Sequence, residues 1–286
     1  IRHDRFGRGP SPMELIGDVA RKSGPVDRLR LEVTKTTCAA SVAERTGLFH
    51  VPPVVRFDAE SGVLETARVH GFRSLMQLVL ARDPRFPEIC ERVGRAIAQV
   101  HTEMRLPEDA RLPFPEPLRG ERADECVLHG DLNGSNVGWD PATDRVVILD
   151  WSAAPALRTA ASIGSRYFDV LWFSHFFFRF RPLRAVSGWS PERWTCAFLS
   201  GYAAVSADFS VEALRAYKAR VEPFMADDYR AERERLGRGV RWIPYRIWQW
   251  LGRRRWEKFL GGLSDSQLRP RGADARVERC AASSES

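Results

Sequence analysis

One segment, residues 129–151, constrains the fold of this chain most strongly because it places polar side chains between two short apolar stretches. The segment reads HGDLNGSNVGWDPATDRVVILDW. Residues 126–129 (CVLH) and 145–151 (RVVILDW) are apolar and predict two buried strands. Four polar residues fall at or near the ends of these strands: His129, Asp131, Asn136 and Asp150. Strand ends flank open space, so these side chains can converge on one site.

The oxygen-bearing side chains of this segment suit a hard cation. Asp131 and Asn136 share one loop, and Asp150 ends a strand that is expected to pair nearby. Magnesium usually takes one or two carboxylates and completes its coordination with water and substrate phosphates. We predict that Asn136 and Asp150 hold Mg²⁺ on the phosphates of ATP, and that Asp131 orients an acceptor hydroxyl or accepts its proton. The alternative is that Asp131 and Asn136 form turns and that His129 is a structural histidine.

The pattern HxDxxxxN, followed by a strand that ends in Asp, resembles the catalytic and metal loops of the protein-kinase-like superfamily. HGD in place of HRD, and DW in place of DFG, are similar to the aminoglycoside phosphotransferase and choline kinase group, whose members phosphorylate small molecules. The resemblance covers about residues 27–205 and is strongest over 126–151. It implies an α+β, bilobal fold, with a small β-rich N-terminal lobe and a larger, mainly helical C-terminal lobe. We place these lobes at residues 1–68 and 69–263, followed by a disordered tail over 264–286.

The same resemblance implies supporting roles for two further residues. His129 is expected to hold the catalytic loop (residues 129–136) rather than to transfer protons, and Asp169 is expected to brace that loop. For Asp169, the cap of a helix over the apolar residues 170–178 is the alternative. A helix that ends in His101 is another point of similarity.

The N-terminal region predicts a small sheet with one or two helices. Residues 13–22 follow Ser-Pro and predict an amphipathic helix, while residues 27–35 alternate polar and apolar side chains and predict a strand. Residues 39–48 look helical, and residues 51–58 and 62–69 predict two more strands on either side of a turn.

A kinase-like enzyme needs a strand lysine on the nucleotide phosphates and a helix glutamate that pairs with it. Lys35, at the end of the predicted strand, and Glu44, on the next predicted helix, are the candidates; an ordinary surface charge is the alternative for each. The resemblance places the adenine of ATP against the backbone between the lobes, around Thr66 to Val69. No GxGxxG loop occurs, so either the phosphate loop is degenerate or strands that carry it precede Ile1.

Charge and cysteine usage bear on partners and location. The net charge of +7 is uneven, with −2 on residues 1–150 and +9 on residues 151–286. The basic half could attract nucleic acid, an anionic membrane or an acidic substrate, or could simply be solvated. No nucleic-acid-binding module accompanies it, so we expect no nucleic-acid partner. Residues 241–260 are rich in Trp and Arg and leave peripheral membrane contact open, with core packing as the alternative. Five dispersed cysteines without a CxxC pair favour a cytoplasmic location.

The sequence therefore favours an ATP- and Mg²⁺-dependent kinase that transfers the γ-phosphate to a hydroxyl of a small molecule. The short stretch between Asp150 and Asp169 leaves little room for a segment that positions a peptide acceptor. The basic C-terminal half favours an anionic or neutral acceptor over a polycationic antibiotic. A non-catalytic pseudokinase scaffold, and a kinase for a lipid-linked or sugar acceptor at a membrane surface, are the alternatives. The oligomeric state is left open.

Overall fold

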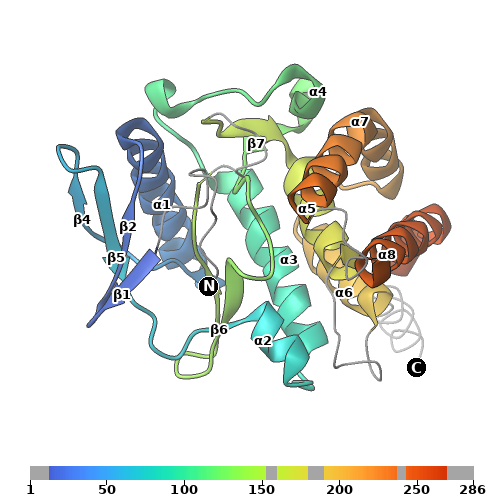
Figure 1. The fold of residues 1–286 in the computed structure, drawn as a ribbon, viewed down its shortest axis with the longest axis horizontal. Coiled ribbons are helices and arrows are strands. Elements are labelled where there is room, and N and C mark those ends of the chain that lie inside the picture. The colour runs from blue at the N-terminus through green and yellow to red at the C-terminus, as the bar shows by residue number, and fades with distance from the viewer. Residues whose placement is uncertain (1–12, 153–159, 180–189, 237–242, 269–286) are drawn as a thin grey trace, which may run out of the picture.

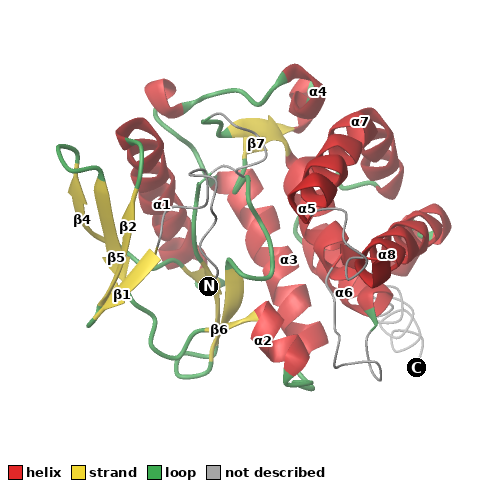
Figure 2. Ribbon diagram, in the orientation of Figure 1, coloured by secondary structure: helices red, strands yellow, loops and turns green. Residues whose placement is uncertain are grey.

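The computed structural model describes residues 13–152, 160–179, 190–236 and 243–268. It has two lobes, with a β-sheet and one long helix on one side and a group of helices on the other (Figure 1). Two further small sheets are present, and their strands are yellow in Figure 2. The predicted bilobal α+β arrangement is confirmed, while the boundary between residues 68 and 69 stays a prediction.

The N-terminal sheet is antiparallel. Its strands are, in spatial order, β1 (Met13–Ile16), β2 (Val19–Ser23), β5 (Val63–Ala67) and β4 (Val54–Asp58). The predicted helix over residues 13–22 is wrong, because these residues form the β1–β2 hairpin. Gly17 makes the turn with a φ of 55°, a conformation that favours glycine, and β5 supplies a partner for β2. Ser-Pro is a signal for the start of a helix, but the turn at Gly17 and the pairing of β2 with β5 favour a hairpin here.

Helix α1 (Val26–Thr46) covers the region for which the sequence predicted a strand and then a helix. The predicted strand over residues 27–35 is wrong, and the predicted helix over 39–48 is the second half of α1. Over the whole segment, buried side chains recur at helical spacing: Leu29, Glu32, Lys35, Thr36, Ala39, Val42 and Ala43. The alternation within residues 27–35 is too short a window to show this period. Gly47 ends the helix in the left-handed conformation, with a φ of 66°.

The middle of the chain builds two small sheets that carry the ends of the polar segment. One has the spatial order β3 (Phe49–His50), β9 (Arg145–Ile148), β8 (Val137–Asp140) and β6 (Arg73–Ser74). The other pairs β7 (Glu125–Val127) with β10 (Ile163–Ser165). The two strands predicted around the polar segment are thus present as β7 and β9. Strand β8 was not predicted and lies inside what the sequence suggested was a long loop.

Helices form most of the C-terminal lobe. They are α2 (Leu75–Leu80), α3 (Phe86–Glu103), α4 (Glu116–Arg119), α5 (Arg166–Arg179), α6 (Pro191–Ala203), α7 (Val211–Leu236), α8 (Ile243–Gly262) and α9 (Asp265–Leu268), with short 3-10 turns at Glu108–Ala110 and Arg122–Asp124. Helices α3 and α6 pack at very short range. A Cβ atom at Gly94 would lie 2.0 Å from the carbonyl oxygen of Phe198, and one at Gly201 would lie 2.0 Å from that of Glu91. Glycine at both positions therefore permits the contact that holds the core of this lobe together.

The C-terminal end of the described chain is packed rather than free. Helix α9 occupies part of the predicted disordered tail, and its Leu268 is buried. The rest of that tail, residues 269–286, lies outside the described residues. In the described part of the chain, no helix is both long enough and apolar enough to cross a membrane.

Candidate active site

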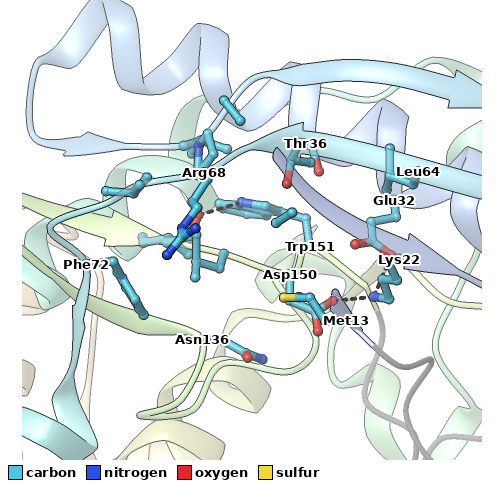
Figure 3. A pocket seen from close by; sticks show the side chains of 18 of the residues that line it. Met13, Lys22, Glu32, Thr36, Leu64, Arg68, Phe72, Asn136, Asp150 and Trp151 are labelled. Carbon is cyan, nitrogen blue, oxygen red and sulfur yellow. Dashed lines mark hydrogen bonds and ion pairs between the residues drawn. The ribbon is translucent and has the colours of Figure 1, made fainter. Parts of the chain in front are cut away.

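A cavity of about 440 Å³ lies between the N-terminal sheet and the polar segment (Figure 3). Its walls come from both lobes and include Lys22, Glu32, Thr36, Leu64, Thr66, Arg68, Val69, Phe72, Asn136, Ile148, Asp150 and Trp151. Most of the lining is apolar; Lys22, Glu32 and Asp150 lie together at one side, and Arg68 lies away from them (Figure 3). A mainly apolar cavity with a few convergent polar groups is the usual form of a small-molecule site.

Lys22 connects the two lobes across this cavity. Its Nζ donates to Oε2 of Glu32 at 2.8 Å and to Oδ1 of Asp150 at 2.9 Å, as Figure 3 shows. Burial alone would lower the pKa of Lys22, but the carboxylates of Asp150 and Glu32 outweigh it and raise that pKa above its usual value. The pKa of Asp150 is lowered in turn, because Lys22 outweighs the effect of burial there. The site therefore holds a protonated lysine against an ionised aspartate.

The structure does not bring the predicted pair, Lys35 and Glu44, together. Both lie on α1, nine residues apart, which corresponds to about 13 Å along a helix axis. Lys35 is fully buried and its Nζ donates to the carbonyl oxygen of His129, while Glu44 is exposed. A strand lysine paired with a helix glutamate is found instead at Lys22 on β2 and Glu32 on α1. The signal that could have found them is the Gly-Asp turn ahead of residues 19–23, which marks a hairpin.

The catalytic loop closes on itself around Asp131. The side-chain nitrogen of Asn136 donates to the backbone oxygen of Asp131 at 2.9 Å and to its Oδ2 at 3.3 Å. Asn133 also donates to the Asp131 backbone oxygen and accepts from the backbone N–H of Ser135. Burial, reinforced by the charge of Asp150, raises the pKa of Asp131 to about 7. A carboxylate with a pKa near neutrality is suited to act as a general base.

His129 has both ring nitrogens engaged by backbone groups. Its Nε2 donates to the carbonyl oxygen of Leu149 at 2.9 Å, and its Nδ1 accepts from the N–H of Asp131 at 3.2 Å. Burial lowers the pKa of His129 to about 4, so the ring is neutral near pH 7. These contacts agree with the supporting role that the resemblance implied.

Asp169 lies in the first turns of α5 and reaches back to the catalytic loop. Its Oδ1 accepts from the N–H of Gly130 at 2.9 Å, and its Oδ2 accepts from the N–H of His129 at 2.6 Å. His101, at the end of α3, contacts the same Oδ2 at 3.1 Å and also meets the hydroxyl of Tyr202 at 2.8 Å. Since Asp169 lies inside α5 and bonds the loop, the alternative of a helix cap is wrong.

Thr66 and Val69 line the cavity where the chain passes from β5 into the C-terminal lobe. Between them, Arg68 ties this connection to the β1–β2 turn: its backbone N–H donates to the oxygen of Asp18 at 2.8 Å, and its side chain donates to that of Gly17 at 3.2 Å. Sequence reasoning missed Arg68 as a wall of the cavity. No local motif marks it, because its place depends on the hairpin that the sequence did not predict.

Asp150 and Asn136 both line the cavity and could hold a divalent cation. Asn136 uses its amide nitrogen on Asp131, so its amide oxygen is the atom suited to a metal. Asp150 has a φ of 55°, a strained conformation for a non-glycine residue of the kind found at functional sites. Within the residues that the structure describes, no group of three or more His, Cys, Asp or Glu side chains could hold a metal. One carboxylate and one amide oxygen fit Mg²⁺ whose coordination is completed by phosphates and water.

One solved structure of a small-molecule kinase shares this fold. Glucosamine kinase in complex with glucosamine, ADP and inorganic phosphate matches with a TM-score of 0.54 and 13% identity, over 88% of this chain and 80% of that chain. A choline/ethanolamine kinase family protein from Mesorhizobium loti matches with a TM-score of 0.44 and 15% identity, over 93% and 90% of the two chains.

An aminoglycoside phosphotransferase from Streptomyces rimosus matches with a TM-score of 0.43 and 17% identity, over 73% of this chain and 86% of that chain. No protein-family model matches the chain, and no curated protein matches it in sequence. At 13% identity, the match to glucosamine kinase shows the fold alone. The resemblance predicted from residues 126–151 is confirmed at that level.

Proposed function

We propose that this protein is an ATP- and Mg²⁺-dependent phosphotransferase that transfers the γ-phosphoryl group of ATP to a hydroxyl of a small molecule. The observation that carries this proposal is the ion-paired group Lys22, Glu32 and Asp150 at one end of the cavity. Asn136 lines the same cavity, and Asp131 lies on the same loop as Asn136. These are the charges and ligands that phosphoryl transfer requires.

Lys22 Nζ lies 2.9 Å from Oδ1 of Asp150. In the proposed complex, Lys22 contacts the ATP phosphates, and Asp150 and Asn136 hold the metal. Mg²⁺, when bound, neutralises the charge of the phosphates. The adenine lies against the backbone between Thr66 and Val69. Glu32 keeps Lys22 in place because it is itself buried and has Lys22 as its ion-pair partner.

Asp131 orients the acceptor and takes its proton. The acceptor oxygen bonds to the γ-phosphorus, the bond from that phosphorus to the bridging oxygen breaks, and ADP leaves with the bond electrons. The acceptor proton passes to the carboxylate of Asp131, whose pKa of about 7 allows it to accept a proton at neutral pH. His129, neutral and bonded at both nitrogens, keeps the loop in position.

A screen of phosphate transfer from γ-labelled ATP tests the proposal. Full-length protein with Mg²⁺ is offered a library of hydroxyl compounds that includes amino sugars, amino alcohols, neutral sugars and sugar acids. Glucosamine is included because a protein of the same fold was solved with it. We expect label in at least one compound, and a loss of about 10²–10⁴-fold in Asp131→Asn. Asp109→Asn, which changes an exposed carboxylate away from the cavity, is the matched control and is expected to keep full transfer.

Two results would contradict the proposal. One is the absence of ATP binding at millimolar concentration. The other is unchanged transfer in Asp131→Asn. Binding of ATP without transfer to any compound would instead favour the pseudokinase scaffold.

A further inference from the structure

A second lysine, Lys35, lies beneath the cavity without lining it. Its side chain is 0% exposed, and its Nζ donates to the carbonyl oxygen of His129 at 2.8 Å. Lys35 follows Glu32 by three residues on α1, so both side chains lie on the same face of that helix. One turn of α1 thus contacts the strand lysine through Glu32 and the catalytic loop through Lys35.

We propose that Lys35 is a positioning residue that fixes the catalytic loop against α1 and thereby sets the location of Asp131 relative to Lys22. This inference rests on the proposed function. Lys35 does not line the cavity, and its side chain bonds the backbone of His129, two residues before Asp131, rather than the carboxylates assigned to the reaction, whose charges lie nearby.

Both backbone polar groups of His129 are hydrogen-bonded to charged side chains. Its N–H donates to Oδ2 of Asp169 on α5, and its carbonyl oxygen accepts from Lys35 on α1. Both hydrogen bonds involve a charged group, which makes them stronger than bonds between neutral partners. The loop is therefore fixed to the C-terminal lobe on one side and to the N-terminal helix on the other.

The burial of Lys35 has a cost that core packing does not explain. Removing an ammonium group from water is unfavourable, and burial lowers the pKa of Lys35 to about 8 despite the nearby carboxylates of Asp169 and Glu32. An uncharged side chain of similar length, such as Met, would fill the same volume without that cost. Only a donor can hold the carbonyl oxygen of His129.

The test compares Lys35→Met with Arg30→Met, which removes an exposed cation from the same helix. Hydrogen exchange is measured first, on full-length protein without nucleotide. In Lys35→Met we expect exchange at residues 129–136 to become about 10–100-fold faster, the factor that corresponds to losing a hydrogen bond to a charged group. Exchange elsewhere in α1 and in α3 should stay within about twofold, and Arg30→Met should match the wild type.

Kinetics give the second readout. We expect kcat of Lys35→Met to fall by about 10–100-fold while the Kd of ATP measured by calorimetry changes by less than about twofold. Uniform loss of protection across α1 and the core, or a fall in ATP affinity as large as the fall in kcat, would overturn the inference.

A substitute variant and a readout without nucleotide ensure that the role of Lys35 can be tested. If Lys35→Met does not fold, Lys35→Gln takes its place with the same expectations, because glutamine is polar but too short to reach the carbonyl oxygen of His129. The exchange readout needs no nucleotide. Failure of the wild type to bind ATP would therefore remove the proposed function, whereas unchanged exchange at residues 129–136 would remove the role of Lys35.

Discussion

The catalytic loop and the N-terminal sheet hold their polar side chains in different ways. In the loop, Asn133 and Asn136 bond Asp131 across only two and five residues of chain. In the sheet, Lys22 depends on Glu32, ten residues away, and on Asp150, 128 residues away in the other lobe. The hydrogen bonds around Asp131 are therefore local, although Lys35 and Asp169 hold the start of the loop from α1 and α5. The position of Lys22, in contrast, requires that α1 and both lobes pack correctly. Substitutions in the two regions should consequently differ in how they change the rate of transfer and the affinity for ATP.

The largest effect is expected at Asp150, because it is both the ion-pair partner of Lys22 and a proposed metal ligand. Asp150→Ala removes the ion-pair partner of Lys22 and a proposed metal ligand together. We expect phosphate transfer to fall by at least about 10³-fold. The measurement is initial rate at saturating Mg²⁺ and ATP, with Asp109→Ala as control. A loss below tenfold would contradict the proposed role of Asp150 as the partner of Lys22 and as a metal ligand.

A smaller effect, of a different kind, is expected at Lys22. Lys22→Met removes the cation proposed to contact the phosphates, so we expect transfer to fall by about 10²-fold and ATP affinity to fall with it. Lys35→Met should lower kcat alone. Calorimetry and steady-state kinetics on the two variants test the contrast between a residue that binds nucleotide and one that positions the loop. Equal losses of ATP affinity in both would erase the distinction.

The pH dependence of the reaction should follow the titration of Asp131 in the loop rather than that of a group in the N-terminal sheet. The pKa of Asp131 is raised to about 7, and only the ionised form can accept a proton. We therefore expect kcat/KM to rise with pH through about 7 and then level off, since this parameter follows groups of the free enzyme. His129, whose pKa is lowered to about 4, should not contribute over this range. A flat profile between about pH 5.5 and 8.5 would contradict the role of Asp131 as base.

The smallest effect is on stability. The pKa of Asp131 is raised from its ordinary value of 3.8 to about 7 in the folded protein. At a pH between these values, the folded state therefore binds a proton that the unfolded state has released. Its contribution to stability is present at low pH and is lost as pH rises through about 7. Asp131→Asn should therefore raise the free energy of unfolding by roughly 1–3 kcal/mol near pH 8 and leave it unchanged near pH 4. Denaturant unfolding at both pH values, with Asp109→Asn as control, checks the sign. A stability gain at pH 4 as large as that at pH 8 would rule out titration of Asp131 as the cause.

The same contrast explains what the sequence could predict. Asp131, Asn136 and Asp150 occur in one short segment whose spacing is informative by itself, so their grouping was predicted. Lys22 and Glu32 are brought together by a hairpin turn and a helix face, neither of which a short window shows. Lys35 was chosen as a strand residue because residues 27–35 alternate, but the helical period of the longer segment governs the structure.

Strand β8 shows the same limitation inside the polar segment. Its residues lie between the two predicted strands, in a stretch that was interpreted as a loop. The pairing with β6 and β9 places it in a sheet, and Gly138 allows close approach: a Cβ atom there would lie 2.3 Å from the carbonyl oxygen of Arg73. Whether such residues form a strand depends on partner strands that are distant in the sequence.

Titration of ATP into the full-length protein, with and without Mg²⁺, tests most directly whether the cavity between the lobes is a metal–nucleotide site. Calorimetry is run on the wild type and on Lys22→Met. We expect saturable binding with Mg²⁺, weaker binding when Mg²⁺ is removed by chelation, and an affinity about tenfold or more lower in Lys22→Met. The same affinity in all three titrations, or no binding at millimolar ATP, would contradict the assignment of Lys22, Asn136 and Asp150 to that site.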